Sequence, residues 1–159
     1  MTDTTLELAV IMGRTVLANK WADSQWEAVG VVPDRPGESH DPRLLHEDAR
    51  GCQWLFPGFR LRLFSDEAEN YLLNVTAPEP RVFVMWRLEQ DLARPALLTV
   101  SYGEAARMMD ADERVDGVPM PADIREWVNE FARRHYRPPE KGKGGRFASQ
   151  RRDGSAHGR

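Results

Sequence analysis

Residues 81–88 read Arg-Val-Phe-Val-Met-Trp-Arg-Leu and decide how the rest of the chain is interpreted. Apolar side chains occupy both alternating sets of positions in this stretch. A strand that is apolar on both faces is typical of a central position in a sheet with both sides covered. The stretch follows Pro-Glu-Pro at 78–80, and residues 96–102 form a second apolar run after a polar turn. The sequence therefore predicts a hairpin, with the strand at 81–88 in the middle of the core.

Two helices are predicted after this hairpin. Ser101 stands three residues before Glu104, the spacing of a capping box, so a short helix is expected over 103–110. Pro121 suits the first position of a second helix, which ends near Tyr136, before two prolines. Apolar residues recur at a spacing of three and four along it, and we expect this stripe to pack on the sheet: Ile124, Trp127, Val128, Phe131 and Ala132.

Upstream of residue 78 the pattern predicts mostly strands. The expected segments are 6–17 as one long strand or a bent pair, 26–32, a hairpin of 53–56 with 59–64, and 71–76 after a turn at 65–70. Pro57-Gly58 suits the tight turn of that hairpin. Residues 33–51 are rich in Pro, Gly, Asp and His without periodicity, so we expect a long loop there.

These elements together predict an α+β protein. We expect an antiparallel sheet or partly open β-barrel of about six to eight strands, with two helices towards the C-terminus. Residues 1–136 form a single domain in this interpretation, with 33–51 as its long loop. Residues 137–159 are expected to be a disordered basic tail, because too few apolar side chains remain there to offset the entropy of ordering.

Charge is divided unevenly along the chain. Residues 137–159 carry seven basic and two acidic side chains, a net charge of +5, so the remaining residues carry −8 of the total of −3. The single cysteine, Cys52, cannot form an internal disulfide. No signal peptide or membrane-spanning run is apparent, so we expect a cytoplasmic protein without membrane contact.

No arrangement of residues typical of a catalytic site is found, so the sequence favours a non-enzymatic protein without a cofactor. His40, His46 and Cys52 lie six residues apart, which matches no close pair of zinc ligands. Residues 110–117 alternate carboxylates in the manner of a calcium loop, but the sixth and twelfth positions lack the required Gly and Glu. A helix end followed by a polar turn explains that segment better.

Two regions are candidates for binding a partner. Trp21 lies in a polar hairpin loop, and a loop predicted between the two helices carries Asp116, Val118, Pro119 and Met120, so both regions can present apolar anchors. For each, packing in the core is the alternative role. The tail supplies basic side chains that can neutralise phosphates or an acidic protein surface: Lys141, Lys143, Arg146, Arg151 and Arg152. A merely solubilising extension is the alternative for the tail.

Several ordered runs give the chain a family resemblance. They are residues 10–14 (Val-Ile-Met-Gly-Arg), 26–33, 78–87, 100–108 and 115–121 (Val-Asp-Gly-Val-Pro-Met-Pro). Over roughly residues 8–138 the sequence resembles an uncharacterised proteobacterial family, domain of unknown function 3305. The resemblance implies a genetic context beside formate dehydrogenase subunits and proteins that handle molybdenum enzymes. It supplies no catalytic residues.

These observations favour an accessory protein that binds another protein. The expected partners are subunits of a molybdenum- or tungsten-containing formate dehydrogenase, or its maturation factors. A nucleic-acid-binding regulator acting through the basic tail is the first alternative. A metal-dependent enzyme using His40, His46 and Cys52 is the second.

Overall fold

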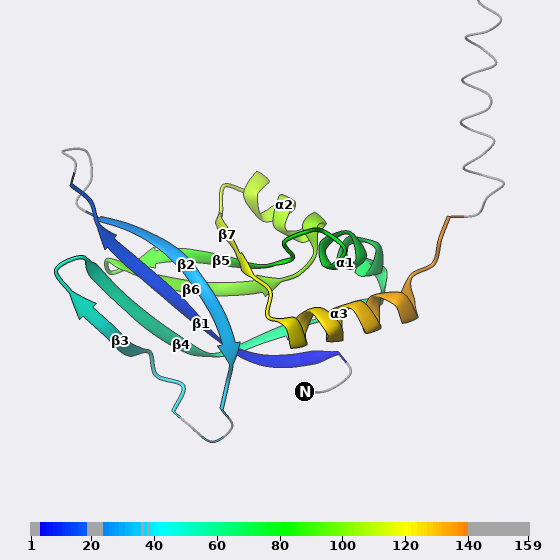
Figure 1. Ribbon diagram of the computed structural model, residues 1–159. Coiled ribbons are helices and arrows are strands. Elements are labelled where there is room, and N and C mark those ends of the chain that lie inside the picture. Colours follow the sequence, from blue (N-terminus) through cyan, green and yellow to red (C-terminus); the bar gives the residue numbers. More distant parts are fainter. Residues whose placement is uncertain (1–3, 19–23, 36, 38, 140–159) are drawn as a thin grey trace, which may run out of the picture.

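The computed structural model describes residues 4–18, 24–35, 37 and 39–139, and Figure 1 shows their arrangement. The elements follow one another in the order β1 (Thr5–Val16), β2 (Ser24–Pro33), β3 (Arg43–Asp48), β4 (Gly51–Arg62), the one-turn helix η1 (Ser65–Glu67), α1 (Ala68–Val75), β5 (Arg81–Glu89), β6 (Leu92–Thr99), α2 (Tyr102–Asp110), β7 (Arg114–Pro119) and α3 (Ala122–His135).

The strands form two antiparallel sheets that share one core. Sheet A has the order β2-β1-β4-β3, and sheet B has the order β6-β5-β7. The two sheets approach each other where β2 meets β7 and where β4 meets β6. They do not close into one barrel, and β3 extends beyond the region that sheet B covers (Figure 1). The predicted α+β class with antiparallel strands is confirmed.

The core lies between the inner faces of the two sheets. Leu8, Val10 and Met12 alternate along β1 and are fully buried, as the period of two of a strand requires. Val82 and Val84 of β5 face them from the central strand of sheet B. The predicted hairpin of β5 and β6, and the central position of β5, are both confirmed.

The predicted hairpin around Pro57-Gly58 is wrong, because β4 runs through this dipeptide as one strand. Phe56 pairs with Val10 and Phe59 pairs with Leu8, so Pro57 and Gly58 form a bulge in the pairing with β1. Gly58 has a φ of 89°, which favours glycine, and its backbone N–H donates to Asp34 Oδ2 at 2.8 Å. The dipeptide therefore bends a long strand and does not reverse the chain.

The strand predicted at 71–76 is also wrong, because these residues belong to α1. Tyr71 and Val75 are four residues apart and both buried, so they form one face of a helix. Asn74, fully buried on the same helix, accepts from Arg81 N at 2.9 Å and donates to Arg81 O and Val100 O at 2.7 and 2.9 Å. These bonds join α1 to the start of β5 and the end of β6.

Two predicted loops contain strands. The loop at 33–51 includes β3, whose six side chains are all exposed and so show no alternation. The loop at 116–121 is largely β7, which pairs with β5. In β7 only Val118 is fully buried, so again the apolar periodicity is weak.

Helices α2 and α3 begin and end close to the predicted positions. Ser101 Oγ accepts from Glu104 N at 3.1 Å, which confirms the N-cap of α2. Pro121, expected as the first helical residue of α3, is its N-cap. Four of the five residues of the α3 stripe are buried and Trp127 is partly buried. The main packing partner of α3 is α1, with the ring centres of Phe131 and Tyr71 6.1 Å apart, and not the sheet (Figure 1). Among the described residues no helix has the length and apolar character to cross a membrane.

Candidate functional site

The residues predicted to bind a partner fall into two groups. Trp21 and the basic side chains Lys141, Lys143, Arg146, Arg151 and Arg152 lie outside the described residues. Asp116, Val118, Pro119 and Met120 lie on β7 or directly after it.

Asp116 joins the two sheets. Its Oδ2 atom accepts from the backbone N–H of Ala28 on β2 at 2.9 Å and from Trp86 Nε1 on β5 at 2.8 Å. Ala28 lies next to a bulge, where the pairing with β1 shifts by one residue. One carboxylate oxygen therefore satisfies a backbone donor of sheet A and a side-chain donor of sheet B, a structural role at the β2–β7 junction.

The apolar residues that follow Asp116 differ in exposure. Val118 is 1% exposed and packs in the core, and Met120 packs against the same core. Pro119 is exposed. Of these three apolar side chains, Pro119 is the most exposed, and its role in binding stays a prediction.

The cysteine and histidines considered as metal ligands do not come together. Cys52 is buried on β4, whereas His46 on β3 is exposed and bonds Asp48 Oδ2 at 3.0 Å. This bond lowers the pKa of Asp48 below its usual range. His40 lies beside Gly58. In the part of the chain that the structure describes, no group of three or more His, Cys, Asp or Glu side chains is placed to hold a metal ion.

A groove that the sequence did not indicate lies between sheet A, sheet B and α2. Its volume is about 520 Å³, and we call it the α2 groove. Three strands or helices that are distant in sequence form its walls: the end of β4, the end of β6, and α2 with the turn after it. The lining residues are Arg60, Arg62, Phe64, Leu97, Leu98, Thr99, Glu104, Arg107, Met108, Ala111 and Glu113.

Exposed apolar side chains distinguish the α2 groove. Phe64 is 44% exposed and Leu97 is 55% exposed, although both are large and apolar. The guanidinium of Arg62 lies 5.7 Å from the centre of the Phe64 ring, the geometry of a cation–π contact. Concave surfaces with apolar walls and a few charged groups are typical binding sites.

Both carboxylates that line the groove are bonded to other side chains of the protein. Glu113 accepts from Arg87 Nε at 2.8 Å, and Glu104 accepts from the hydroxyl of Thr99 at 2.6 Å. Three guanidinium groups, those of Arg60, Arg62 and Arg107, also line the groove. The lining therefore carries one more positive than negative charge, which favours a ligand with a carboxylate.

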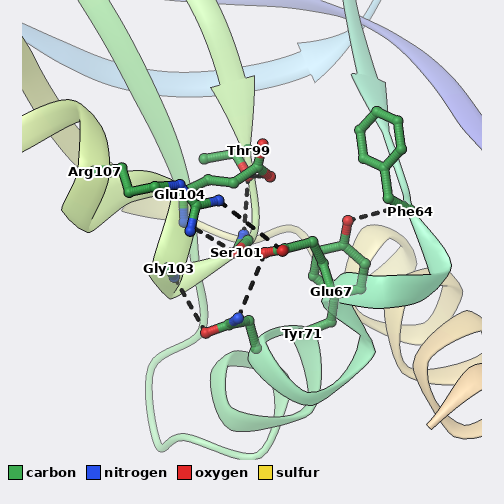
Figure 2. Close-up of polar contacts among 9 residues, drawn as sticks. Phe64, Glu67, Tyr71, Thr99, Ser101, Gly103, Glu104 and Arg107 are labelled. Atoms are coloured by element: carbon green, nitrogen blue, oxygen red, sulfur yellow. Dashed lines mark hydrogen bonds and ion pairs between the residues drawn. The ribbon is translucent and has the colours of Figure 1, made fainter.

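A hydrogen-bond network holds the wall of the groove that α2 forms (Figure 2). The hydroxyl of Ser101 donates to Glu67 of η1 while it caps α2. Thr99 Oγ1 accepts from Ser101 N at 3.0 Å and donates to Glu104, so the end of β6 and the first turn of α2 are fixed together. Arg107 lies 4.0 Å from the other oxygen of Glu67.

The same network reaches the segment that carries Phe64. The hydroxyl of Tyr71 accepts from Phe64 N at 2.9 Å, as Figure 2 shows, and so anchors the backbone from which the exposed ring projects. Burial raises the pKa of Tyr71 well above its usual range, since ionisation would place a charge in the core. Asn70 adds a bond from Gly103 N to its Oδ1 at 3.2 Å, which links α1 to α2. The groove is thus built on fixed side chains and backbone.

Sequence patterns gave little indication of this site. The alternation Arg60-Leu61-Arg62 does indicate that Leu61 faces the core and both arginines face solvent. Nothing local to the sequence shows that β6 and α2 lie beside those arginines.

Comparisons with known proteins place the chain in a family. No curated protein and no solved structure matches it. The family model of DUF3305, described as a protein of unknown function, matches residues 7–144. Because that match covers most of the chain, the protein belongs to the DUF3305 family.

Proposed function

We propose that this protein is a non-enzymatic accessory protein that binds a segment of a partner protein in the α2 groove. The observation that carries the proposal is the exposure of Phe64 and Leu97 inside a concave surface beside three arginines. Large apolar side chains at the centre of a contact, with charges at its rim, supply most of the binding energy in protein interfaces. The segment that fits presents an apolar side chain next to a carboxylate.

The partner we propose is a formate dehydrogenase subunit or a maturation protein for that enzyme in the cytoplasm. Support for this choice comes from the family resemblance, which implies a genetic context of molybdenum- and tungsten-containing formate dehydrogenases. An accessory protein requires a surface for its client and no reactive groups. The α2 groove is such a surface.

Co-purification from the native host, grown so that formate dehydrogenase is made, tests this proposal. Wild-type protein should recover the enzyme or its maturation factors. Leu97→Glu should not, because it places a charged carboxylate where the apolar side chain of the partner binds. Leu73→Glu is the matched control, since Leu73 is 56% exposed on α1 and does not line the groove.

The outcomes are distinct. Recovery of neither the enzyme nor its maturation factors by wild-type protein would refute the proposed partner. Equal recovery by wild type and Leu97→Glu would refute the groove as the binding site. Thermal unfolding of both variants checks that each is folded, and little change is expected because both side chains are exposed.

The charge of residues 137–159 supports a second candidate function, binding to nucleic acid. Seven basic side chains against two acidic ones can neutralise several phosphates. Affinity in a mobility-shift titration should then fall steeply with salt and disappear after truncation following Arg137. Absence of binding at low salt would exclude this function.

A further inference from the structure

Strand β3 forms an edge of sheet A that no other described strand covers. It pairs with β4 on one side, and its other side has no strand partner in the described ranges. All six of its side chains are exposed, and two of them, Leu44 and Leu45, are leucines at 46% exposure each. An open strand edge with apolar side chains at its centre is a template for pairing with another strand.

The faces of β3 follow from its pairing with β4. Arg43 opposes Leu55, which opposes Ile11 on the outer face of sheet A. Leu44 opposes Trp54, which opposes the buried Met12, so Leu44 lies on the inner face.

The remaining positions of β3 are shifted by a bulge at Leu45. Leu45 lines a groove of about 510 Å³ together with Arg43 and Ile11, so it also lies on the outer face. Beyond the bulge, His46 and Asp48 lie on the outer face, where they bond each other, and Glu47 lies on the inner face.

A two-fold pairing of β3 with itself has one register that pairs all six residues, and this register places like faces together. In this register Arg43 opposes Asp48, Leu44 opposes Glu47, and Leu45 opposes His46. Shifting the strands by one residue either way places an inner side chain opposite an outer one, because the bulge breaks the alternation. The allowed register joins opposite charges at both of its ends.

We infer that β3 pairs with β3 of a second copy of this chain, in an antiparallel arrangement that makes one continuous eight-stranded sheet from two copies of sheet A. Arg43 of each copy lies opposite Asp48 of the other, so the dimer contains this ion pair twice. The hydrogen bonds that Asp48 accepts from His46 and from Arg50 N, at 2.8 Å, hold its carboxylate in the ionised form. The outer grooves beside Leu45 become neighbours across the two-fold axis.

Sedimentation equilibrium of the full chain tests this inference through a charge exchange. Wild-type protein should show a dimer of twice 18.2 kDa that dissociates on dilution. Arg43→Glu should weaken the dimer about tenfold, because opposite charges facing across strands become like charges at both ends of the pairing. Asp48→Arg should do the same. The double variant Arg43→Glu/Asp48→Arg should restore most of the affinity, since each exchanged charge again faces its opposite in the other copy.

Leu45→Lys provides a second disruption, and Leu88→Lys is its matched control at the same exposure of 46% on β5. Amide hydrogen exchange of residues 43–48 in wild-type protein should slow as protein concentration rises, which gives a readout independent of any variant. A wild-type protein that stays monomeric over the whole concentration range overturns the inference. A dimer that survives Leu45→Lys unchanged, or a double variant no tighter than either single one, overturns the proposed pairing.

Discussion

Removing the carboxylate of Asp116 should loosen the junction between the two sheets. In Asp116→Ala, both the backbone N–H of Ala28 and Trp86 Nε1 lose their acceptor, and Trp86 is only 5% exposed. A hydrogen bond to a charged group contributes about 1.5–3 kcal/mol, and taking the lower value for these part-buried bonds gives a loss of about 3 kcal/mol. That is a large share of the roughly 5–15 kcal/mol by which a typical domain is stable.

Urea unfolding measures this loss. With a slope of about 2 kcal/mol per M, the midpoint of Asp116→Ala should fall by about 1.5 M. Asp116→Asn keeps an acceptor oxygen without the charge, so its midpoint should fall by about half as much. Asp41→Ala, at an exposed position, is the control and should leave the midpoint unchanged.

A structural readout accompanies the urea series. The indole N–H resonance of Trp86 should move in Asp116→Ala and stay in place in Asp41→Ala. A midpoint shift below about 0.5 M in Asp116→Ala, or an unmoved Trp86 resonance, would refute the role assigned to this carboxylate.

Three further substitutions, at Gly51, Ser101 and Tyr71, test other contacts that stabilise the fold. In urea unfolding, Gly51→Ala should destabilise the fold by several kcal/mol, because a Cβ there would lie 1.8 Å from Arg14 O and the φ of Gly51 is 151°. Gly30 has open space around it, so Gly30→Ala is the control and should be near neutral. Ser101→Ala removes both the α2 cap and the bond to Glu67, so thermal unfolding should show a loss of about 2–3 kcal/mol, against little for Ser65→Ala at an exposed position. The pKa of Tyr71 is raised in the folded state, so the phenol of the unfolded chain ionises first as the pH rises. The free energy of unfolding should therefore hold steady below about pH 10 and fall above it. Tyr71→Phe should flatten this decline in urea titrations from pH 8 to 11, and an unchanged decline would show that other groups cause it.

Elements whose residues carry their own periodicity could be predicted from the sequence. The α3 stripe repeats at three and four residues over a helix of 14 residues, and the cap at Ser101 is a local signal read over four positions. The both-face apolar pattern of β5 likewise reflects its central place in sheet B, where Phe83 also contacts the ring of Tyr102 at the start of α2. These are cases in which local propensity and tertiary packing agree.

The wrong predictions, a strand at 71–76 and a hairpin around Pro57-Gly58, arose where tertiary contacts override the local conformational preference of the residues. Tyr71 to Thr76 contains Tyr, Val and Thr, which favour strands, yet burial of Tyr71 and Val75 and the three bonds of Asn74 make it helical. Pro57-Gly58 suits a type II turn or a bulge equally well, because glycine readily adopts the positive φ that either can contain. Pairing with β1 and the distant acceptor Asp34 decide between them.

The α2 groove could not be predicted from the sequence, for a related reason. Arg62, Leu97 and Arg107 come from three elements, and each side chain alone is an ordinary exposed residue. Only the approach of β4 to β6, and the network from Glu67 through Ser101, place them around one concavity. Asp116 was singled out from the sequence as a binding residue, and the structure gives its carboxylate a role in joining the sheets.

The affinity of the recovered partner for wild-type and variant protein tests the central claim most directly. In isothermal titration calorimetry, Leu97→Glu should bind the purified partner at least about tenfold more weakly than wild type, since truncation or reversal at the centre of an interface costs more than 1 kcal/mol. Leu73→Glu should bind as wild type does. Equal affinity of all three proteins would contradict the assignment of the α2 groove as the binding site.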